Sequence, residues 1–259
     1  MAKTALITGA SSGIGMEFAG IFAREGYDLV LVARDAEKLN QVRDALVAGY
    51  GHSITVLPLD LASSGAPEAL VEALQAQGVV VDVLVNNAGI GDFTRFIDED
   101  AAKLRAMLRI NVVVPTMLAR LIGARMAERG SGQILNVASV AAFMPGPWMA
   151  AYYASKAHVL SLSEALAVEF EGTGVSVTAL CPGRTATPFM EDSGMIHSKV
   201  VSGKRLPLPK FVAEYGYKAM KKKKRVAIYG IGNKLLVFII RFLPRNRVAK
   251  MVQKRQAPK

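Results

Sequence analysis

The most regular feature of the sequence is an alternation of short apolar runs with longer segments whose apolar residues recur at helical spacing. The runs at residues 4–8 and 28–33 are β-prone and of the kind that a parallel sheet buries on both faces. Similar runs lie at residues 53–59, 79–86, 132–138 and 174–181. Helix-compatible segments separate the early runs. This alternation predicts right-handed βαβ crossovers, and therefore an α/β doubly wound parallel sheet with helices on both faces.

The pattern changes after about residue 183, where prolines interrupt it. A chain of 259 residues, 51% of them hydrophobic, is long enough to bury one large core, so we expect a single domain over residues 1–259. Within it we expect a core at residues 1–183, an irregular lid at 184–225, and a basic, partly apolar C-terminal extension at 226–259.

A glycine-rich turn, Thr8-Gly9-Ala10-Ser11-Ser12-Gly13-Ile14-Gly15, stands between the first predicted strand and the first predicted helix. Glycines let the backbone turn sharply and approach a pyrophosphate, whose charge the helix N-terminus favours. The turn therefore predicts a dinucleotide site in the core. By itself the motif also fits a turn without any ligand. The residues expected to contact the cofactor here are Gly9, Ser11, Ser12, Gly13, Ile14 and Gly15.

The end of the second predicted strand bears on which dinucleotide is bound. An acidic residue about 20 positions after the turn would hold the adenosine ribose of NAD. The strand instead ends Ala33-Arg34-Asp35. A guanidinium suits bidentate contact with a 2′-phosphate, so Arg34 favours NADP(H) over NAD(H). Asp35, directly beside it, keeps NAD(H) open.

Candidate chemistry lies in Tyr152-Tyr153-Ala154-Ser155-Lys156, which begins a helix-compatible stretch. A spacing of four places Tyr152 and Lys156 on one helix face. An ammonium stabilises a phenolate and lowers the pKa of a tyrosine from about 10, which suits a general acid or base. The same spacing also occurs by accident in many surface helices, and Tyr153 lacks a lysine four residues later.

Taken together, these motifs resemble the short-chain dehydrogenase/reductase family in its classical subgroup, over residues 3 to about 190. The resemblance implies a Rossmann fold. It rests on the order and spacing of the glycine turn at 8–15, Asp60-Leu61, Asn86-Asn87-Ala88-Gly89, Asn111, Ser139, Tyr152, Lys156, and Pro182-Gly183 with Thr187.

The resemblance implies roles along the cofactor. Asp60 and Leu61 would border the adenine, and Asn87 and Gly89 would lie along the dinucleotide. Pro182, Gly183, Thr185 and Thr187 would meet its carboxamide end. Arg184, within that loop, is expected to face solvent.

The resemblance also implies a catalytic set of Asn111, Ser139, Tyr152 and Lys156. Ser139 would hydrogen-bond the substrate oxygen and stabilise developing negative charge. Tyr152 would transfer the proton. Lys156 would hold the nicotinamide ribose and lower the pKa of Tyr152. Asn111 would hold a water in a proton relay to Lys156.

The substrate is expected to be a hydrophobic small molecule. The segment Phe143-Met144-Pro145-Gly146-Pro147-Trp148-Met149 lies between Ser139 and Tyr152 and carries large apolar and thioether groups. Family resemblance extends this to a ketone, a steroid-like compound or a 3-oxoacyl compound, although the segment could serve only packing or a subunit contact. The family also implies a homo-oligomer, a dimer or tetramer, with helices near 103–129 and 152–170 pairing between subunits.

Positive charge is concentrated at the C-terminus. Residues 199–259 hold 18 Lys or Arg and one acid, Glu214, which gives +17, whereas residues 1–198 hold 14 and 20, which gives −6. Three interpretations stay open: a solvated basic face covering the active site, peripheral membrane contact through an interfacial helix spanning Lys218–Leu243, or recognition of phosphate-bearing acyl carriers or nucleic acid. Nucleic acid is the less favoured partner.

The remaining polar chemistry is sparse. Cys181, the single cysteine, ends an apolar run and is expected to be buried, and the three histidines lack metal-ligand spacing, so we expect no metal. The start of the sequence lacks a signal-peptide pattern, and a cytoplasmic location is expected. The sequence therefore predicts an NADP(H)-dependent oxidoreductase acting on a carbonyl or alcohol. The alternative is a non-catalytic NADP(H) sensor that acts through its basic tail.

Overall fold

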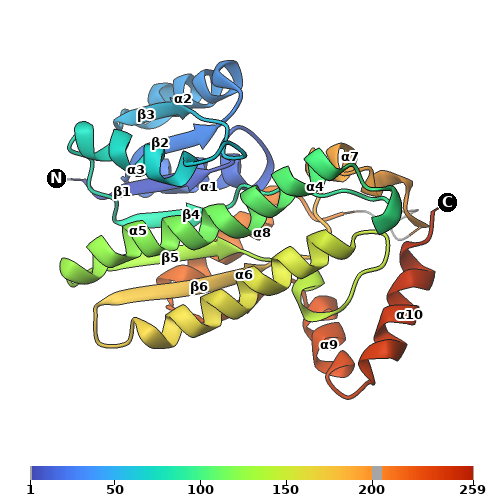
Figure 1. Cartoon of the computed structure of the whole chain (residues 1–259). Coiled ribbons are helices and arrows are strands. Elements are labelled where there is room, and N and C mark those ends of the chain that lie inside the picture. The colour runs from blue at the N-terminus through green and yellow to red at the C-terminus, as the bar shows by residue number, and fades with distance from the viewer. Residues whose placement is uncertain (1, 200–205, 259) are drawn as a thin grey trace.

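A seven-stranded parallel sheet forms the centre of the fold in the computed structural model, which describes residues 2–199 and 206–258 (Figure 1). Its order is β3-β2-β1-β4-β5-β6-β7, and every neighbouring pair is parallel. The strands are β1 (Thr4–Thr8), β2 (Asp28–Ala33), β3 (Ile54–Pro58), β4 (Val83–Asn86), β5 (Gly132–Val137), β6 (Val175–Cys181) and β7 (Val226–Ile228). The predicted doubly wound α/β sheet is confirmed. The strand order reverses between β1 and β4, where open sheets of this kind have their ligand crevice.

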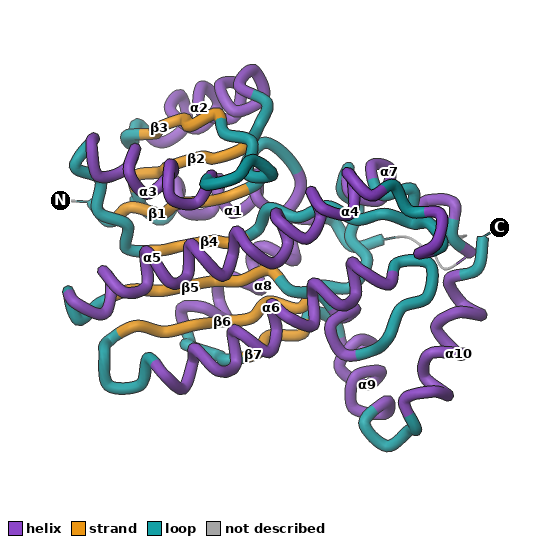
Figure 2. The backbone as a smooth tube through the Cα atoms, viewed as in Figure 1, coloured by secondary structure: helices purple, strands orange, loops and turns teal. Residues whose placement is uncertain are grey.

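Helices cover both faces of the sheet, as Figure 2 shows. They are α1 (Gly13–Arg24), α2 (Ala36–Tyr50), α3 (Ala66–Ala76), α4 (Ala101–Leu108), α5 (Val114–Glu128), α6 (Ala150–Glu169), α7 (Phe189–Asp192), α8 (Pro209–Lys221), α9 (Ile231–Ile240) and α10 (Arg245–Gln256). A π-helical segment, Arg109–Val113, joins α4 to α5. Three short 3₁₀ helices span Phe96–Asp98, Val140–Phe143 and Met195–His197.

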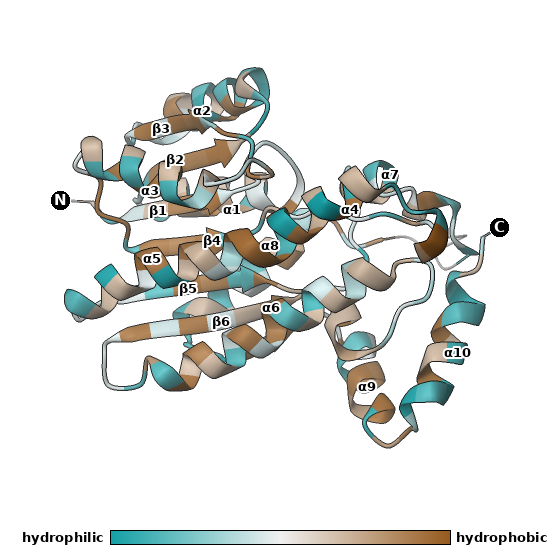
Figure 3. Ribbon diagram, in the orientation of Figure 1, coloured by the Kyte–Doolittle hydropathy of each residue, from teal (hydrophilic) through white to brown (hydrophobic). Residues whose placement is uncertain are grey.

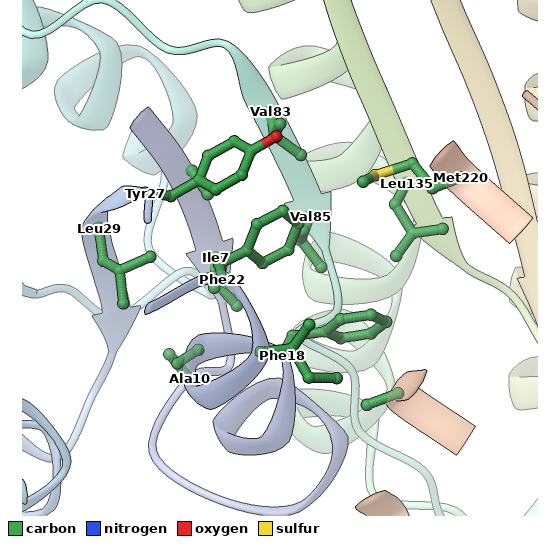
Figure 4. Close-up of a cluster of buried hydrophobic side chains, with 14 of the residues drawn as sticks. Ile7, Ala10, Phe18, Phe22, Tyr27, Leu29, Val83, Val85, Leu135 and Met220 are labelled. Carbon is green, nitrogen blue, oxygen red and sulfur yellow. The ribbon is translucent and has the colours of Figure 1, made fainter. Parts of the chain in front are cut away.

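Alternation along each strand divides the core into two layers, because successive side chains point to opposite faces. Ile7 faces α1, α2 and α8, where Phe18, Phe22 and Met220 are fully buried (Figure 4). Leu6, its neighbour in β1, packs in the other layer with residues of α3 and α5. Hydrophobic residues therefore dominate the strands (Figure 3), and the central strands are buried on both faces.

The region after residue 183 differs from the prediction in two respects. The interfacial helix predicted over Lys218–Leu243 is wrong, because α8 ends at Lys221 and the chain turns at Lys223, whose φ is +52°. Val226–Ile228 then pairs with β6 as β7, which buries Ala227 at the edge of the sheet. In addition, α8 lies within the predicted lid range but packs against α1 in the core.

The glycine turn is held tightly against the start of the β4–α4 connection. Thr8 Oγ1 accepts hydrogen bonds from the backbone N–H groups of Asn87 and Ala88, both at 3.0 Å. Asn87 Nδ2 donates to the carbonyl oxygens of Thr8 and Gly9, at 3.0 and 3.1 Å. A Cβ at Gly15 would overlap the Gly9 carbonyl oxygen. The turn therefore requires glycine at Gly15 for packing rather than for an unusual φ.

This packing predicts opposite effects for the same substitution at two glycines of α1. Gly15→Ala should lower the free energy of unfolding by about 1–3 kcal/mol, because backbone atoms must move to admit the methyl group. Gly20→Ala should raise it by about 0.5–1 kcal/mol, since a Cβ there meets nothing within 4 Å and alanine favours the helix. Denaturant unfolding measures both changes. Equal effects in the two variants would contradict this account of the turn.

Candidate active site

A cleft of about 1400 Å³ opens at the carboxyl ends of the strands, at the β1–β4 switch point. Most of the site residues predicted from the sequence line it, although they come from seven separate segments of the chain. The exceptions are Gly15 and Asn111, which lie behind the lining. The predicted residues that line the cleft are Gly9, Ser11, Ser12, Gly13, Ile14, Arg34, Asp60, Leu61, Asn87, Gly89, Ser139, Tyr152, Lys156, Pro182, Gly183, Thr185 and Thr187.

The β2–α2 connection presents a basic end of this cleft. Arg34 is exposed to it, and Lys38 of α2 lines it as well. Asp35 is occupied locally: its carboxylate accepts from the Lys38 backbone N–H at 3.0 Å and lies 3.2 Å from Lys38 Nζ. Both contacts hold the pKa of Asp35 below its ordinary value, the backbone hydrogen bond most strongly. Asp35, the acidic residue that left NAD(H) as an alternative in the sequence, therefore caps α2.

Tyr152 and Ser139 face each other inside the cleft. Burial raises the pKa of the Tyr152 phenol to about 12, and a side-chain hydrogen bond with Ser139 opposes that rise. Ser139 is held in place as the cap of the 3₁₀ helix Val140–Phe143, where its Oγ accepts from the Ala141 N–H at 3.1 Å. A phenol kept neutral beside an oriented hydroxyl is arranged to donate hydrogen bonds to one oxygen atom of a ligand.

Lys156 lies one helical turn after Tyr152 and is nearly sealed from solvent, with 5% of its surface exposed. Its Nζ donates to the carbonyl oxygen of Val137 at 2.8 Å and lies 5.9 Å from the centre of the Tyr152 ring. Burial lowers the pKa of Lys156 to about 8. The site thus contains a cation that desolvation has brought close to losing its proton.

Asn111 supports this arrangement from behind. It lies in the π-helical segment, where its Oδ1 accepts from the Ile90 N–H at 3.0 Å and its Nδ2 donates to the Ile90 carbonyl at 2.8 Å and to Ser155 Oγ at 3.0 Å. The side chain therefore ties the loop after β4 to α6. A Cβ at Gly89 would lie 3.2 Å from Lys156 Nζ and 3.4 Å from Asn111 Oδ1, so the chain passes close to both groups.

The loop after β6 lines the cleft near Ser139, Tyr152 and Lys156. Thr185 is buried and its hydroxyl donates to the Gly183 carbonyl at 3.1 Å. The Thr187 side chain lies against Gly13 of the glycine turn. Cys181 is buried as expected, and burial raises the pKa of its thiol to about 12, which keeps it an unreactive thiol.

The other end of the cleft is largely apolar. Met149, Met190 and Met195 cluster there with Tyr152 and Phe189. Met144 and Met251 also line the cleft. Thioether side chains are flexible and polarisable, so this wall can adapt to a bulky apolar ligand.

Sequence reasoning missed a wall of this cleft that comes from α9 and α10. Asn233, Leu236, Val252 and Gln256 all line it. Gln256 Nε2 donates to the Tyr153 hydroxyl at 2.6 Å, which joins α10 to the residue after Tyr152. The apolar spacing of Val248 and Val252 was the signal available in the sequence, but it does not say which surface α10 covers.

The expectation that Arg184 faces solvent is wrong. The residue is partly buried and lines the cleft together with Arg255 of α10. Burial lowers the pKa of its guanidinium, with nearby Arg255 adding to the effect and Tyr153 opposing it.

Comparison with known proteins agrees with the geometry. The family model described as short chain dehydrogenase matches residues 3–195. Ketoacyl reductase HetN of Nostoc sp. is 36% identical over 226 residues, which is 85% of this chain and 76% of that protein. Probable oxidoreductase EphD of Mycobacterium tuberculosis is 34% identical over 93% of this chain, but the chain spans 44% of EphD.

Solved structures match over nearly the full length. A short-chain dehydrogenase from Sphingobium yanoikuyae in complex with NADPH has a TM-score of 0.83 at 29% identity, covering 96% of this chain and 99% of that one. A structure on 7β-hydroxysteroid dehydrogenase stereoselectivity has a TM-score of 0.86 at 27% identity, covering 96% of both chains. A 3-ketoacyl-(acyl-carrier-protein) reductase from Brucella melitensis, complexed with NADH, has a TM-score of 0.76 at 31% identity over 87% of this chain and 95% of that one.

The buried cation predicts a specific pH dependence of stability. The unfolded chain keeps the Lys156 proton up to its ordinary pKa of 10.5, whereas the folded protein loses it above about 8. Between these values the unfolded state binds more protons, so the stability of the protein should rise with pH relative to Lys156→Met, by a total on the order of 3 kcal/mol. Urea unfolding of both proteins without cofactor measures this. The exposed substitution Lys210→Met is the control and should follow the parent. If the free energies of unfolding of the parent and of Lys156→Met changed equally with pH, the burial of this charge would be refuted.

Proposed function

Because the chain belongs to the short-chain dehydrogenase/reductase family, we propose that it is an NADP(H)-dependent oxidoreductase that transfers hydride between nicotinamide and a carbonyl or alcohol carbon of a hydrophobic substrate. The observation that carries this proposal is the convergence of Ser139, Tyr152 and Lys156 on one cleft that the glycine turn also lines. A protein that only bound the dinucleotide would not need a buried phenol and a buried ammonium at its apolar end.

The residues around the cleft fit a bound dinucleotide. Glycines at the turn and at Gly89 leave the room that a pyrophosphate and a ribose require, and the α1 N-terminus favours the negative charge. When bound, the nicotinamide supplies or accepts the hydride. Arg34, Lys38 and the N-terminus of α2 favour a 2′-phosphate, and the pairing of the Asp35 carboxylate with Lys38 offsets the negative charge that would repel it. These features support NADP(H) rather than NAD(H).

Proton transfer in this proposal belongs to Tyr152. In reduction its hydroxyl gives a proton to the carbonyl oxygen as hydride reaches the carbonyl carbon, and in oxidation its phenolate takes the alcohol proton. Ser139 donates to the same oxygen and stabilises its developing negative charge. Lys156 opposes the effect of burial on Tyr152, since a nearby ammonium stabilises the phenolate. A contact between Lys156 and the nicotinamide ribose would keep that ammonium in place.

Asn111 acts in this scheme as a positioning residue. Its amide already makes three hydrogen bonds, to Ile90 and Ser155. A water that returns protons toward Lys156 would therefore bind at a backbone carbonyl of the π-helical segment rather than at the amide. Such segments leave a carbonyl without its usual helical partner.

The apolar end of the cleft supports a bulky hydrophobic substrate. Its methionine-lined wall suits a ketone, a steroid-like compound or a 3-oxoacyl compound. The relatives named above include a ketoacyl reductase and a hydroxysteroid dehydrogenase, which is consistent with this range. We further propose a cytoplasmic homo-oligomer that pairs through α4, the π-helical segment, α5 and α6, along which Leu108, Val113 and Val168 are exposed.

Tyr152→Phe tests the proton-transfer role. It should lower kcat by about 10²–10⁴-fold, because the phenyl ring keeps the packing and loses the proton. Turnover of apolar ketones, 3-oxoacyl thioesters and steroids is followed by the absorbance of NADPH, and NADPH binding is measured in parallel and should persist. Tyr153→Phe is the matched control and should keep most of the activity. Tight NADPH binding by the parent with no turnover of any compound would favour the non-catalytic sensor.

Arg34→Ser tests the cofactor preference. Loss of a charge-assisted contact to the 2′-phosphate should weaken NADPH binding by about tenfold or more and leave NADH binding nearly unchanged. Arg105→Ser, at an exposed position outside the cleft, should change neither affinity. Titration calorimetry on the parent and both variants gives the six dissociation constants. An equal loss for NADPH and NADH would contradict the role assigned to Arg34.

A further inference from the structure

Helix α9 and the turn after it expose an unusually apolar surface. Ile231 is 84% exposed and Phe242 is 73% exposed. Leu235, Phe238 and Ile239 are exposed as well, and the rings of Phe238 and Phe242 contact each other in solvent with centroids 5.3 Å apart. At ~100° per residue these five side chains fall on one side of the helix. We call them the α9 stripe.

The opposite side of α9 is packed into the protein. Val237 and Ile240 are buried, and Ile240 forms a cluster with Val248 and Val252 of α10. Phe143, Met144 and Tyr153 pack against that cluster. In Figures 1 and 2 the two helices form a hairpin beside the carboxyl ends of the strands. The stripe therefore projects from a fixed element and does not result from fraying of the chain end.

All charged residues of the α9–α10 hairpin, which carries the α9 stripe, are basic. No acidic residue follows Glu214 in the sequence, and seven exposed cations lie on the hairpin. Lys234 and Arg241 flank the stripe on α9. The remaining five are Arg245, Arg247, Lys250, Lys254 and Arg255. Long basic side chains can direct their charged ends toward lipid headgroups while their stems cover apolar surface.

An apolar stripe surrounded by cations could be covered by a second copy of the chain or by a lipid surface, and the charge favours one of them. A second copy of the chain docked face to face would bring two sets of cations together with no acid on either hairpin, which opposes association. An anionic lipid surface offers an apolar boundary for the stripe and negative headgroups for the cations. The charge of the surface thus favours lipid.

The length of α9 fixes how it would lie. Ten residues extend about 15 Å, half of the roughly 30 Å hydrocarbon thickness that a spanning helix must cross. Among the described residues, the segment Ala101–Glu128 is long and apolar enough to span a membrane, but half of its apolar window is buried inside the fold. α9 would therefore lie in the plane of the interface with the stripe facing the acyl chains.

We propose that the α9–α10 hairpin binds anionic membrane surfaces through the α9 stripe and the basic residues around it. Lipid binding does not depend on the proposed function. Where that function holds, the hairpin has a second consequence: Leu236, Met251 and Val252 line the cleft from the inner side of the same hairpin. The wall of the substrate site is then part of the element that contacts lipid, which suits an apolar substrate dissolved in the membrane.

The test is co-sedimentation of the full chain with vesicles of phosphatidylglycerol and phosphatidylcholine, and with vesicles of phosphatidylcholine alone. Binding should require phosphatidylglycerol and should weaken as salt is added. Phe238→Ser/Phe242→Ser should reduce binding about tenfold or more. The control, Phe96→Ser/Ile97→Ser, removes two equally exposed apolar side chains from the 3₁₀ helix before α4 and should bind like the parent.

NADPH binding and thermal unfolding verify that both double variants are folded. If the α9 variant fails to fold, Arg245→Glu/Arg247→Glu replaces it, since both positions are exposed and should lose binding for the electrostatic reason. Equal binding to the two kinds of vesicle, equal loss in the control, or no vesicle binding by the parent would overturn the proposal. So would a parent oligomer, seen by light scattering, that Phe238→Ser/Phe242→Ser dissociates, because the stripe would then be a subunit interface.

Discussion

The burial of one ammonium group is the constraint on which the site depends. Lys156 is carried by α6 and buried, and its Nζ donates a hydrogen bond to the carbonyl oxygen of Val137 at the end of β5. Desolvation makes that cation unfavourable, and the same desolvation raises the pKa of Tyr152. In the proposed function the two effects oppose each other, because an ammonium near a phenol stabilises the phenolate that burial disfavours. Under that proposal, part of the stability of the fold is given up for a proton-transfer group.

The rest of the fold holds this pair in register. The π-helical segment carries Asn111, whose amide hydrogen-bonds both to Ile90 in the loop after β4 and to Ser155, the residue before Lys156 on α6. Ser139 caps the 3₁₀ helix Val140–Phe143, and the hydrogen bond from the Ala141 N–H orients its hydroxyl without a ligand. Parallel strands make this convergence possible, since their carboxyl ends all meet at one edge of the sheet.

The sequence predicts the core of this arrangement well and its periphery poorly, for a physical reason. Apolar runs and glycine spacing report local backbone needs, so β1 to β6 and the glycine turn follow from the pattern alone. The inward course of Arg184 and the docking of Gln256 on Tyr153 depend on contacts between distant segments. The predicted helix over Lys218–Leu243 failed because β7 needs an open sheet edge, which a local pattern of basic and apolar residues does not reveal.

The central claim is that a phenol with a pKa near 12 is made competent by the positive charge placed beside it. The most direct measurement is an ultraviolet difference titration of tyrosinate in the protein with and without NADP⁺, using Tyr152→Phe to isolate the signal of this residue. The account predicts that one tyrosine ionises at a distinctly lower pH when NADP⁺ is bound, because the oxidised ring adds positive charge and Lys156 is held in place, and that this ionisation is absent from the variant. An identical titration with and without NADP⁺, or a shift that survives in Tyr152→Phe, would contradict it.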